Sequence, residues 1–442
     1  MVAVLERVTE WFHGELPRLN RLVLFDSAPA SLVVDQLADT VLAGLPDPGR
    51  LTAREAQQLV VGLGLAGASV ARHHQEQDPR RKLVPESSFA GLRAGPTGLP
   101  FQQYFGALAD RTGTGHYHRD SYASLVLWNV PTTEVHWREQ RLAVLPGVFD
   151  DGRTRSYTGD GGEKRFFALI KKGETIELAV NILLQPISDG TLAFTDPAAV
   201  RAVRLAATLL DALRELFVDF AAAPVSEGIH PEYFLDVFRQ FAVHWEVGDI
   251  PPSGALDVES LKRDFLLGID YPGYAARVHL LMPALLGAER AELADLMARP
   301  PLPATLLQSV GVAPEKLSTL ADADLRALVV RHPVLVDWYL LLTAHARAAG
   351  GHLMLSKRFL FNPQRARDAE GAGDHPLVSN RRGTTGMDES FLGQLTHARK
   401  GHLLAALRRC GAAALAQPVR HDDAAAADIS TVVVGPMEVD DA

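Results

Sequence analysis

The amino-acid sequence predicts an all-α fold, or nearly so. Alanine and leucine are abundant, whereas aromatic residues make up 7% of the chain, and this balance favours helices over sheets. Apolar residues recur at helical spacing, most clearly at Leu205, Leu209, Leu213 and Phe217. The regularly spaced short strands that are typical of β-sandwiches and β-barrels are missing from the sequence.

The predicted helices alternate with loops rich in glycine and proline. Residues 1–80 are predicted to be helical, and residues 81–115 to loop across the surface. The apolar run at 122–128 is too short for periodicity to decide between strand and helix. Further helices are predicted at 163–184, 196–220, 230–245, 257–267, 274–298, 303–310, 322–361 and 388–410, with loops at 150–163, 248–254 and 362–387.

Composition restricts the class of protein. The net charge of −9 offers no excess of Lys and Arg to neutralise phosphates, so nucleic acid is not an expected partner. No apolar run reaches the roughly 18 residues that a membrane span needs. Residues 1–19 contain three glutamates and lack the apolar segment of a signal peptide. Cys410 is the single cysteine, which excludes an intrachain disulfide. We therefore expect a soluble, cytoplasmic protein.

Two short motifs have weak support. The stretch from Gly62 to Gly67 satisfies the dinucleotide pattern GxGxxG, but it follows a helical segment rather than a buried strand. His118 and Asp120, together with His116 or another histidine, could form a two-histidine-one-carboxylate iron(II) site. Such sites usually sit in β-helices, whose strands this sequence lacks. A polar loop that lines some other pocket is the alternative.

His352 differs from most of the 16 histidines in its surroundings. Apolar residues recur at helical spacing from Leu325 to Phe361. Gly350 and Gly351 would cost stability inside a helix, yet they would let another group approach the backbone closely; a helix break is the alternative. If the helix continues, one face carries His345, Ala349, His352, Ser356 and Phe359.

Several stretches, in this order, resemble the indoleamine 2,3-dioxygenase and monodechloroaminopyrrolnitrin synthase-like superfamily of haem enzymes. They are residues 122–131, 164–169, 229–239 and 297–304, then His352, then residues 383–386. The resemblance covers roughly residues 115 to 410 and rests on order and spacing rather than on one motif. It implies a smaller N-terminal helical domain at 1–115 that caps a large helical haem-binding domain at 116–410. Residues 411–442, rich in Ala and Asp, are predicted to be a disordered tail.

The resemblance also implies roles for individual residues. His352 would be the axial ligand of a haem b iron, with His345 as the runner-up, and O2 would be the co-substrate. The reductant is not identified. Arg239 would bind a substrate carboxylate. In a regular α-helix Phe234, Phe238 and Arg239 could not all point the same way, although Phe234 and Arg239 could share one cavity edge. The other implied substrate-binding residues are Tyr122, Phe166, Phe167, Gly383, Thr384, Thr385 and Gly386.

The implied activity is oxygenation of tryptophan or of a modified indole or aromatic amino acid. The sequence departs from the family at Ile170, where a distal serine is expected, and at Thr385, where the loop normally ends in two glycines. These departures favour a specialised enzyme of secondary metabolism over plain tryptophan dioxygenation. Two alternatives stay open: a non-haem iron(II) oxygenase that uses the His-x-Asp motif, and a haem-binding protein without turnover.

Overall fold

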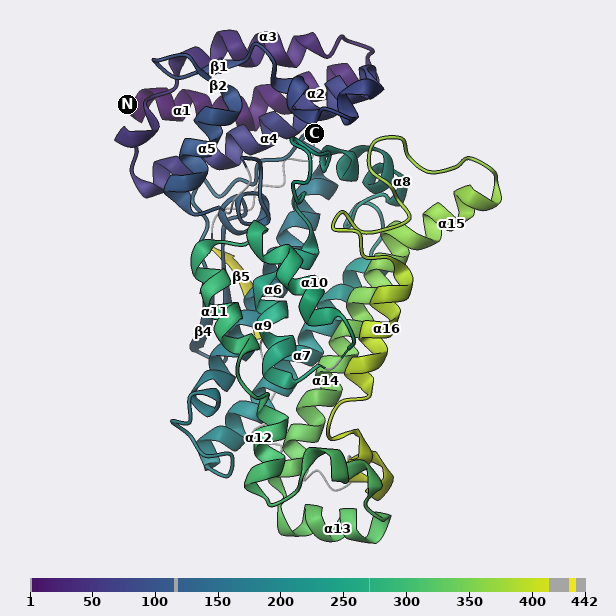
Figure 1. The fold of residues 1–442 in the computed structure, drawn as a ribbon. Helices are drawn as coiled ribbons and strands as arrows, with labels where there is room; N and C mark the ends of the chain where they lie inside the picture. The colour runs from purple at the N-terminus through teal and green to yellow at the C-terminus, as the bar shows by residue number, and fades with distance from the viewer. Residues whose placement is uncertain (1, 115–117, 270, 413–428, 435–442) are drawn as a thin grey trace.

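The computed structural model describes residues 2–114, 118–269, 271–412 and 429–434. Helices account for 67% of the protein and strands for 4%, so the predicted helical character is confirmed. The N-terminal helices lie across one end of the molecule, and long helices run lengthwise from there to the opposite end (Figure 1).

The N-terminal part is built around one buried helix. Its helices are α1 (Val2–Glu10), α2 (Leu16–Phe25), α3 (Ser31–Thr40), α4 (Ala53–Gln77) and α5 (Phe101–Thr112), with the short strands β1 (Arg93–Ala94) and β2 (Leu99–Pro100). The prediction of a surface loop over 81–115 is wrong for α5, which buries Phe101, Tyr104 and Phe105. α4 begins with a capping box in which Thr52 and Glu55 each satisfy the other's backbone N–H. A Cβ at Gly62 would lie 2.0 Å from the Phe12 ring, and one at Gly67 would lie 2.2 Å from Trp245. These glycines therefore permit close packing inside a helix, and the GxGxxG stretch is no dinucleotide loop.

Three long helices form the body of the protein: α6 (Gly161–Ser188), α7 (Pro197–Ala222) and α14 (Val334–Ser356). α7 buries Leu209, Leu213 and Phe217, in agreement with its predicted amphipathic face. α14 continues through Gly350 and Gly351 without a break. A Cβ at Gly351 would lie 3.2 Å from the carbonyl oxygen of Arg214 in α7. The close approach that Gly351 permits is therefore that of a neighbouring helix.

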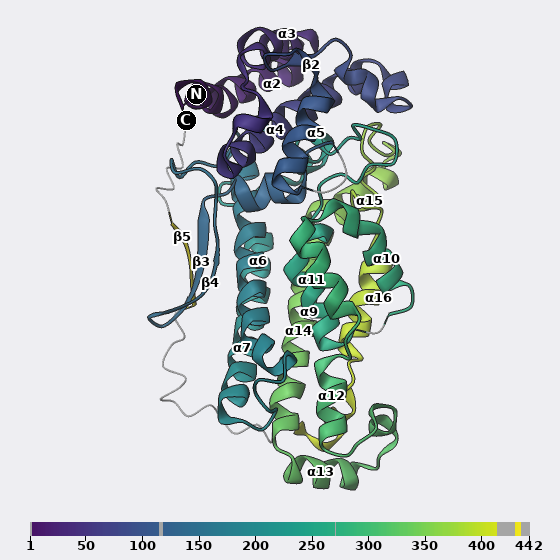
Figure 2. The ribbon, with the colours of Figure 1, turned by 60° about the vertical axis from the view of Figure 1, so that its left-hand side comes forward.

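A three-stranded antiparallel sheet lies along the outer side of α6 (Figure 2). It pairs β3 (Thr132–Trp137) with β4 (Gln140–Leu145) on one side and with β5 (Ile429–Val434) on the other. β5 lies inside the segment that was predicted to be disordered, and that prediction is wrong for these six residues. Their sequence, Ile-Ser-Thr-Val-Val-Val, is rich in β-branched residues, which favour a strand when a partner edge is present.

The remaining helices surround this body. They are α8 (Pro231–Tyr233), α9 (Val258–Leu267), α10 (Tyr274–Leu281), α11 (Gly287–Met297), α12 (Leu302–Ser309), α13 (Asp322–Arg331), α15 (Asn362–Ala369) and α16 (Glu389–Lys400). Pro333 separates α13 from α14, so the predicted helix at 322–361 is interrupted there. Among the described helices none is long and apolar enough to cross a membrane alone. One pair, α13 with 334–369, meets that test jointly but bends by 108°.

Candidate functional site

A largely apolar cavity of about 320 Å³ lies among the long helices. Its walls come from α6, α7, α9, α14 and α16 and from the 383–386 loop. This volume is within the range of small-molecule and cofactor sites, roughly 300–1,000 Å³. Of the residues predicted to form the site, His352, Arg239, Tyr122, Phe166, Phe167, Phe234, Gly383, Thr384 and Thr385 line it. Gly386 does not.

Three π-helical segments of the described chain line the cavity: η6 (Ala123–Trp128), η7 (Phe234–Phe238) and η12 (Lys357–Phe361). A π-turn shifts side chains away from the α-helical periodicity, and such turns are frequent at functional sites. As a result Phe234, Phe238 and Arg239 all reach the cavity. The expectation that they could not all point the same way took 230–245 as a regular α-helix, whereas the structure has the π-turn η7 there.

His352 faces the cavity from α14. The His352 side chain is solvent-accessible, and it lines the cavity wall. The Phe217 ring packs edge-on against the imidazole with the ring centres 5.8 Å apart. Neither ring nitrogen has a hydrogen bond from any described residue. Burial lowers the pKa of His352, and the positive charge of Arg399 lowers it further. The imidazole is therefore neutral and free to bind a metal.

His345, about two turns earlier in α14, is not available as a ligand. Arg263 Nε donates to His345 Nδ1 at 3.0 Å, so the ring proton lies on Nε2, which donates to Asp264 Oδ1 at 2.9 Å. The residue is fully buried, and burial lowers its pKa to about 4. With both ring nitrogens engaged, the runner-up ligand is excluded by geometry.

Asp264 connects four helices next to the cavity. From α9 it accepts hydrogen bonds from Arg399 Nε and Nη2 on α16, at 3.0 and 2.5 Å. It also accepts one from the Tyr274 hydroxyl on α10 at 2.5 Å, in addition to His345 on α14. Burial alone would raise the pKa of Asp264, but the Arg399 charge and these hydrogen bonds hold it far below its usual range.

Aromatic rings fill one end of the cavity. Phe166 contacts Phe234 and Phe238, with ring centres 5.2 and 5.5 Å apart, and Phe167 lies 5.2 Å from Phe238. Phe359 packs 5.9 Å from Phe234. Tyr122 also lines the wall, but its hydroxyl points away and donates to Glu174 at 2.9 Å. This end of the cavity can hold a flat aromatic group between ring edges and faces.

Arg239 is a buried cation that forms no ion pair with a described residue, although the negative charge of Asp374 acts on it. Its Nη2 donates to the carbonyl oxygens of Ser379, at 2.8 Å, and of Arg382. Its Nε has no partner at all. Burial lowers its pKa to about 10, so the guanidinium still carries its charge at neutral pH. An anionic group in the cavity would complete its coordination.

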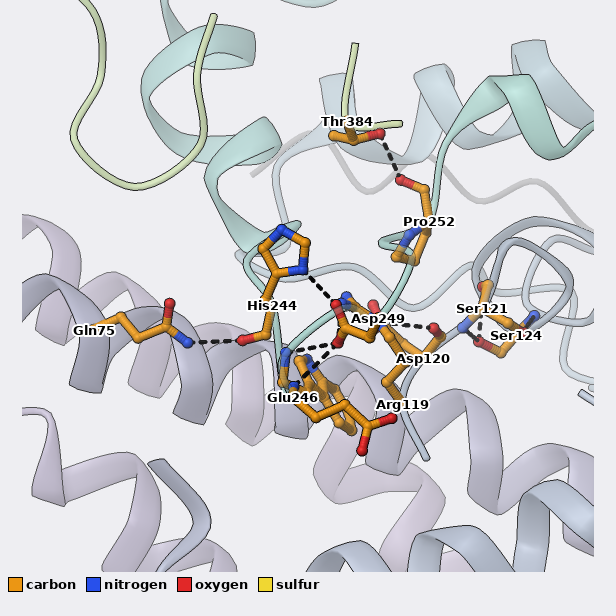
Figure 3. Close-up of polar contacts among 11 residues, drawn as sticks. Gln75, Arg119, Asp120, Ser121, Ser124, His244, Glu246, Asp249, Pro252 and Thr384 are labelled. Atoms are coloured by element: carbon orange, nitrogen blue, oxygen red, sulfur yellow. Dashed lines mark hydrogen bonds and ion pairs between the residues drawn. The ribbon is translucent and has the colours of Figure 1, made fainter. Parts of the chain in front are cut away.

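The 383–386 loop is held in place from two sides. Gly386 N–H bonds to the Gly383 carbonyl at 2.8 Å, and Gly386 has a φ of +83°, which favours glycine. Thr384 Oγ1 donates to the Pro252 carbonyl at 3.0 Å (Figure 3), whereas Thr385 Oγ1 has no hydrogen-bond partner among the described residues. The loop therefore offers one free hydroxyl beside the cavity.

The His-x-Asp motif does not form an iron site in the described part of the chain. His118 is exposed and packs its ring over Gly106, whereas Asp120 is buried and paired with Arg119 at 2.8 Å. His116 lies outside the described residues. The described residues contain no cluster of three metal-ligating side chains.

No protein-family model matches the chain, and no curated protein matches its sequence.

Sequence reasoning missed the polar groups of the cavity wall. Glu177 and Asp257 line it, and burial, followed by the charges of Glu177 and Glu174, raises the pKa of Asp257 well above its usual value. Arg263 forms an ion pair with Glu177 at 2.7 Å. The partners are separated widely in sequence, so local patterns give no signal for them. The sequence held one local signal: Asp257 follows the Pro- and Gly-containing segment 251–256 and is the N-cap of α9, a position that Asp favours.

Replacing Asp264 with Asn leaves Arg399 buried without its counter-charge. Breaking a buried pair in this way costs about 3–5 kcal/mol, and we expect that loss in the free energy of unfolding at pH 7. The Asp264 carboxylate has a lowered folded-state pKa, so its stabilisation is present above about pH 4 and is lost as the pH falls further. The difference between wild type and variant should therefore shrink below that pH in urea unfolding.

Asp211→Asn is the matched control. It removes the exposed ion pair between Asp211 on α7 and Arg347 on α14, whose side chains are 42% and 45% exposed. Exposed pairs contribute about 0–1 kcal/mol, so a small change is expected. Equal effects of the two substitutions would contradict the role given to Asp264.

Proposed function

We propose that the protein is a haem-dependent oxygenase that acts on an aromatic amino acid, with His352 as the axial ligand of haem b. The observation that carries this proposal is the contrast between two histidines of one helix. Both ring nitrogens of His345 are hydrogen-bonded, to Arg263 and Asp264, whereas the neutral ring of His352 has no hydrogen-bond partner among the described residues and faces a largely apolar cavity. Neutral imidazole is the usual proximal ligand of a haem iron.

The residues present fit a haem. The cavity wall is mainly apolar, which suits the face of a macrocycle, and His352 offers an unshared nitrogen from one side. When bound, ferrous haem with one imidazole ligand supplies an open coordination position for O2. Fixed walls and the 383–386 loop would exclude water from this space.

The substrate position follows from the remaining wall residues. The Phe166, Phe234 and Phe238 rings would hold a flat aromatic group, and the unpaired guanidinium of Arg239 would bind a carboxylate. Thr385 Oγ1 is available for a further hydrogen bond. Ile170 also lines the cavity, where related enzymes are expected to place a serine. That apolar wall supports a modified aromatic substrate and a role in secondary metabolism.

The proposal also includes the domain arrangement and the cellular compartment. The resemblance implies that the N-terminal helices cap a haem-binding domain. The single cysteine, Cys410, is buried and free, which fits a reducing compartment such as the cytoplasm.

The haem ligand is tested by substituting His352. Purified His352→Ala protein should lack the Soret band of the wild type, or lose its shift on addition of carbon monoxide to the ferrous form. Added imidazole should restore haem binding, because the small ligand fills the space of the deleted ring. A wild type without haem after expression with ample precursor would contradict the proposal.

His345→Gln serves as the comparison, since it removes an imidazole from the same helix while the Gln amide can still accept from Arg263 and donate to Asp264. It should keep the wild-type absorption spectrum. A haem that binds in the wild type but does not respond to carbon monoxide or O2 would instead identify a haem-binding protein without turnover.

The role of Arg239 is tested with ligands that differ in a carboxylate. Loss of a charge-assisted hydrogen bond costs about 1.5–3 kcal/mol, which corresponds to roughly 10- to 100-fold in affinity. Arg239→Gln should weaken binding of indole-3-propionate by that factor and leave binding of indole unchanged in calorimetry. Equal weakening of both ligands would show that Arg239 acts through packing instead.

A further inference from the structure

Two charges of opposite sign reach the cavity without a complete set of partners. Arg239 forms no ion pair with a described residue, and its Nε is unbonded. Asp120 also lines the cavity, is 1% exposed, and has no hydrogen-bond partner for its Oδ2. Leaving a buried charged group partly unpaired is costly. Such a pair of groups is expected where a ligand supplies the missing partners.

Arg119 does not fully neutralise the charge of Asp120, because it also pairs with Asp249. Arg119 donates from Nε and Nη2 to Asp120 Oδ1 at 3.0 and 2.8 Å, but its Nη1 is taken by Asp249 Oδ2 at 2.8 Å. Asp249 Oδ1 contacts the half-exposed His244 ring at 2.5 Å (Figure 3). Two carboxylates thus share one guanidinium. Of these two carboxylates Asp120 is the one at the cavity, and burial raises its pKa to about 6, so it is largely ionised at neutral pH.

No neighbouring residue donates a hydrogen bond to Asp120 Oδ2 in the described structure. Ser124 donates its hydroxyl to the Ser121 carbonyl and accepts from the Ser121 N–H, and Ser121 Oγ accepts from the Ser124 N–H, at 2.9 to 3.1 Å (Figure 3). α4 packs against the other side, where a Cβ at Gly64 would lie 3.1 Å from the Asp120 Cβ. Tyr157 lines the cavity and has no hydrogen bond at its hydroxyl in the described structure. The cavity side is therefore where a partner can approach.

We propose that Asp120 determines specificity by binding the ammonium group of the ligand whose carboxylate Arg239 binds. The cavity would then select aromatic α-amino acids over aromatic acids that lack the amino group. This inference rests on the proposed function, because it uses the same cavity and the same carboxylate site. Oδ2 has almost no accessible surface before binding, so binding includes a local shift of the wall at Asp120.

The test compares two ligands that differ in the amino group. Dissociation constants of L-tryptophan and indole-3-propionate are measured by calorimetry on the full-length, haem-loaded protein. The wild type should bind L-tryptophan more tightly. Asp120→Asn should weaken L-tryptophan by about 10- to 100-fold, the effect of losing a hydrogen bond to a charged group. Indole-3-propionate should bind the variant as well as it binds the wild type.

Asp249→Asn is the matched control. It removes the other carboxylate of Arg119, which leaves that guanidinium to Asp120 alone, but it keeps Asp120 Oδ2 at the cavity, so the preference for L-tryptophan should decrease less than in Asp120→Asn. Haem content and thermal unfolding report whether either variant is merely misfolded. Equal binding of the two ligands by the wild type, or equal weakening of both by Asp120→Asn, would overturn the inference. Binding of neither ligand to the wild type would contradict the proposed function itself.

Discussion

The buried carboxylate of Asp264 is the interaction on which the rest of the site depends. It ties α9 to α10, α14 and α16 through Tyr274, His345 and Arg399. Because His345 is fixed, the α14 face that it shares with His352 is fixed as well, since seven residues make about two helical turns. The cavity can remain open between these helices because charged side chains, rather than a ligand, hold this end of it together.

The shape of the apolar end of the cavity depends on π-helical turns rather than on charged groups. η6, η7 and η12 replace regular α-helix by π-turns along the cavity wall, and Phe234 of η7 meets Phe238 of the same turn and Phe359 of η12 there. Each π-turn redirects side chains that an α-helix would spread around its axis. The result is a wall of ring faces and edges on segments that are far apart in the chain.

The sequence predicted the long elements better than the site geometry. α6 and α7 followed from the spacing of their apolar residues, and the rejection of the GxGxxG stretch followed from its helical context. The π-turn at Phe234–Phe238 could not be predicted, because the same residues satisfy an α-helical pattern. β5 was missed because its strand depends on an edge of β3 that lies far away in sequence. The Asp264 and Asp120 clusters were missed for the same reason: long-range pairing leaves no local pattern.

We propose that His352 binds a haem iron in this cavity. A crystal structure of protein produced with iron and haem precursor, with anomalous diffraction recorded at the iron edge, would locate the metal. We expect one iron peak inside the cavity, within bonding distance of a His352 ring nitrogen, and a flat macrocycle around it. An iron held by His118 and Asp120, or a cavity without iron in protein that carries haem elsewhere, would contradict it.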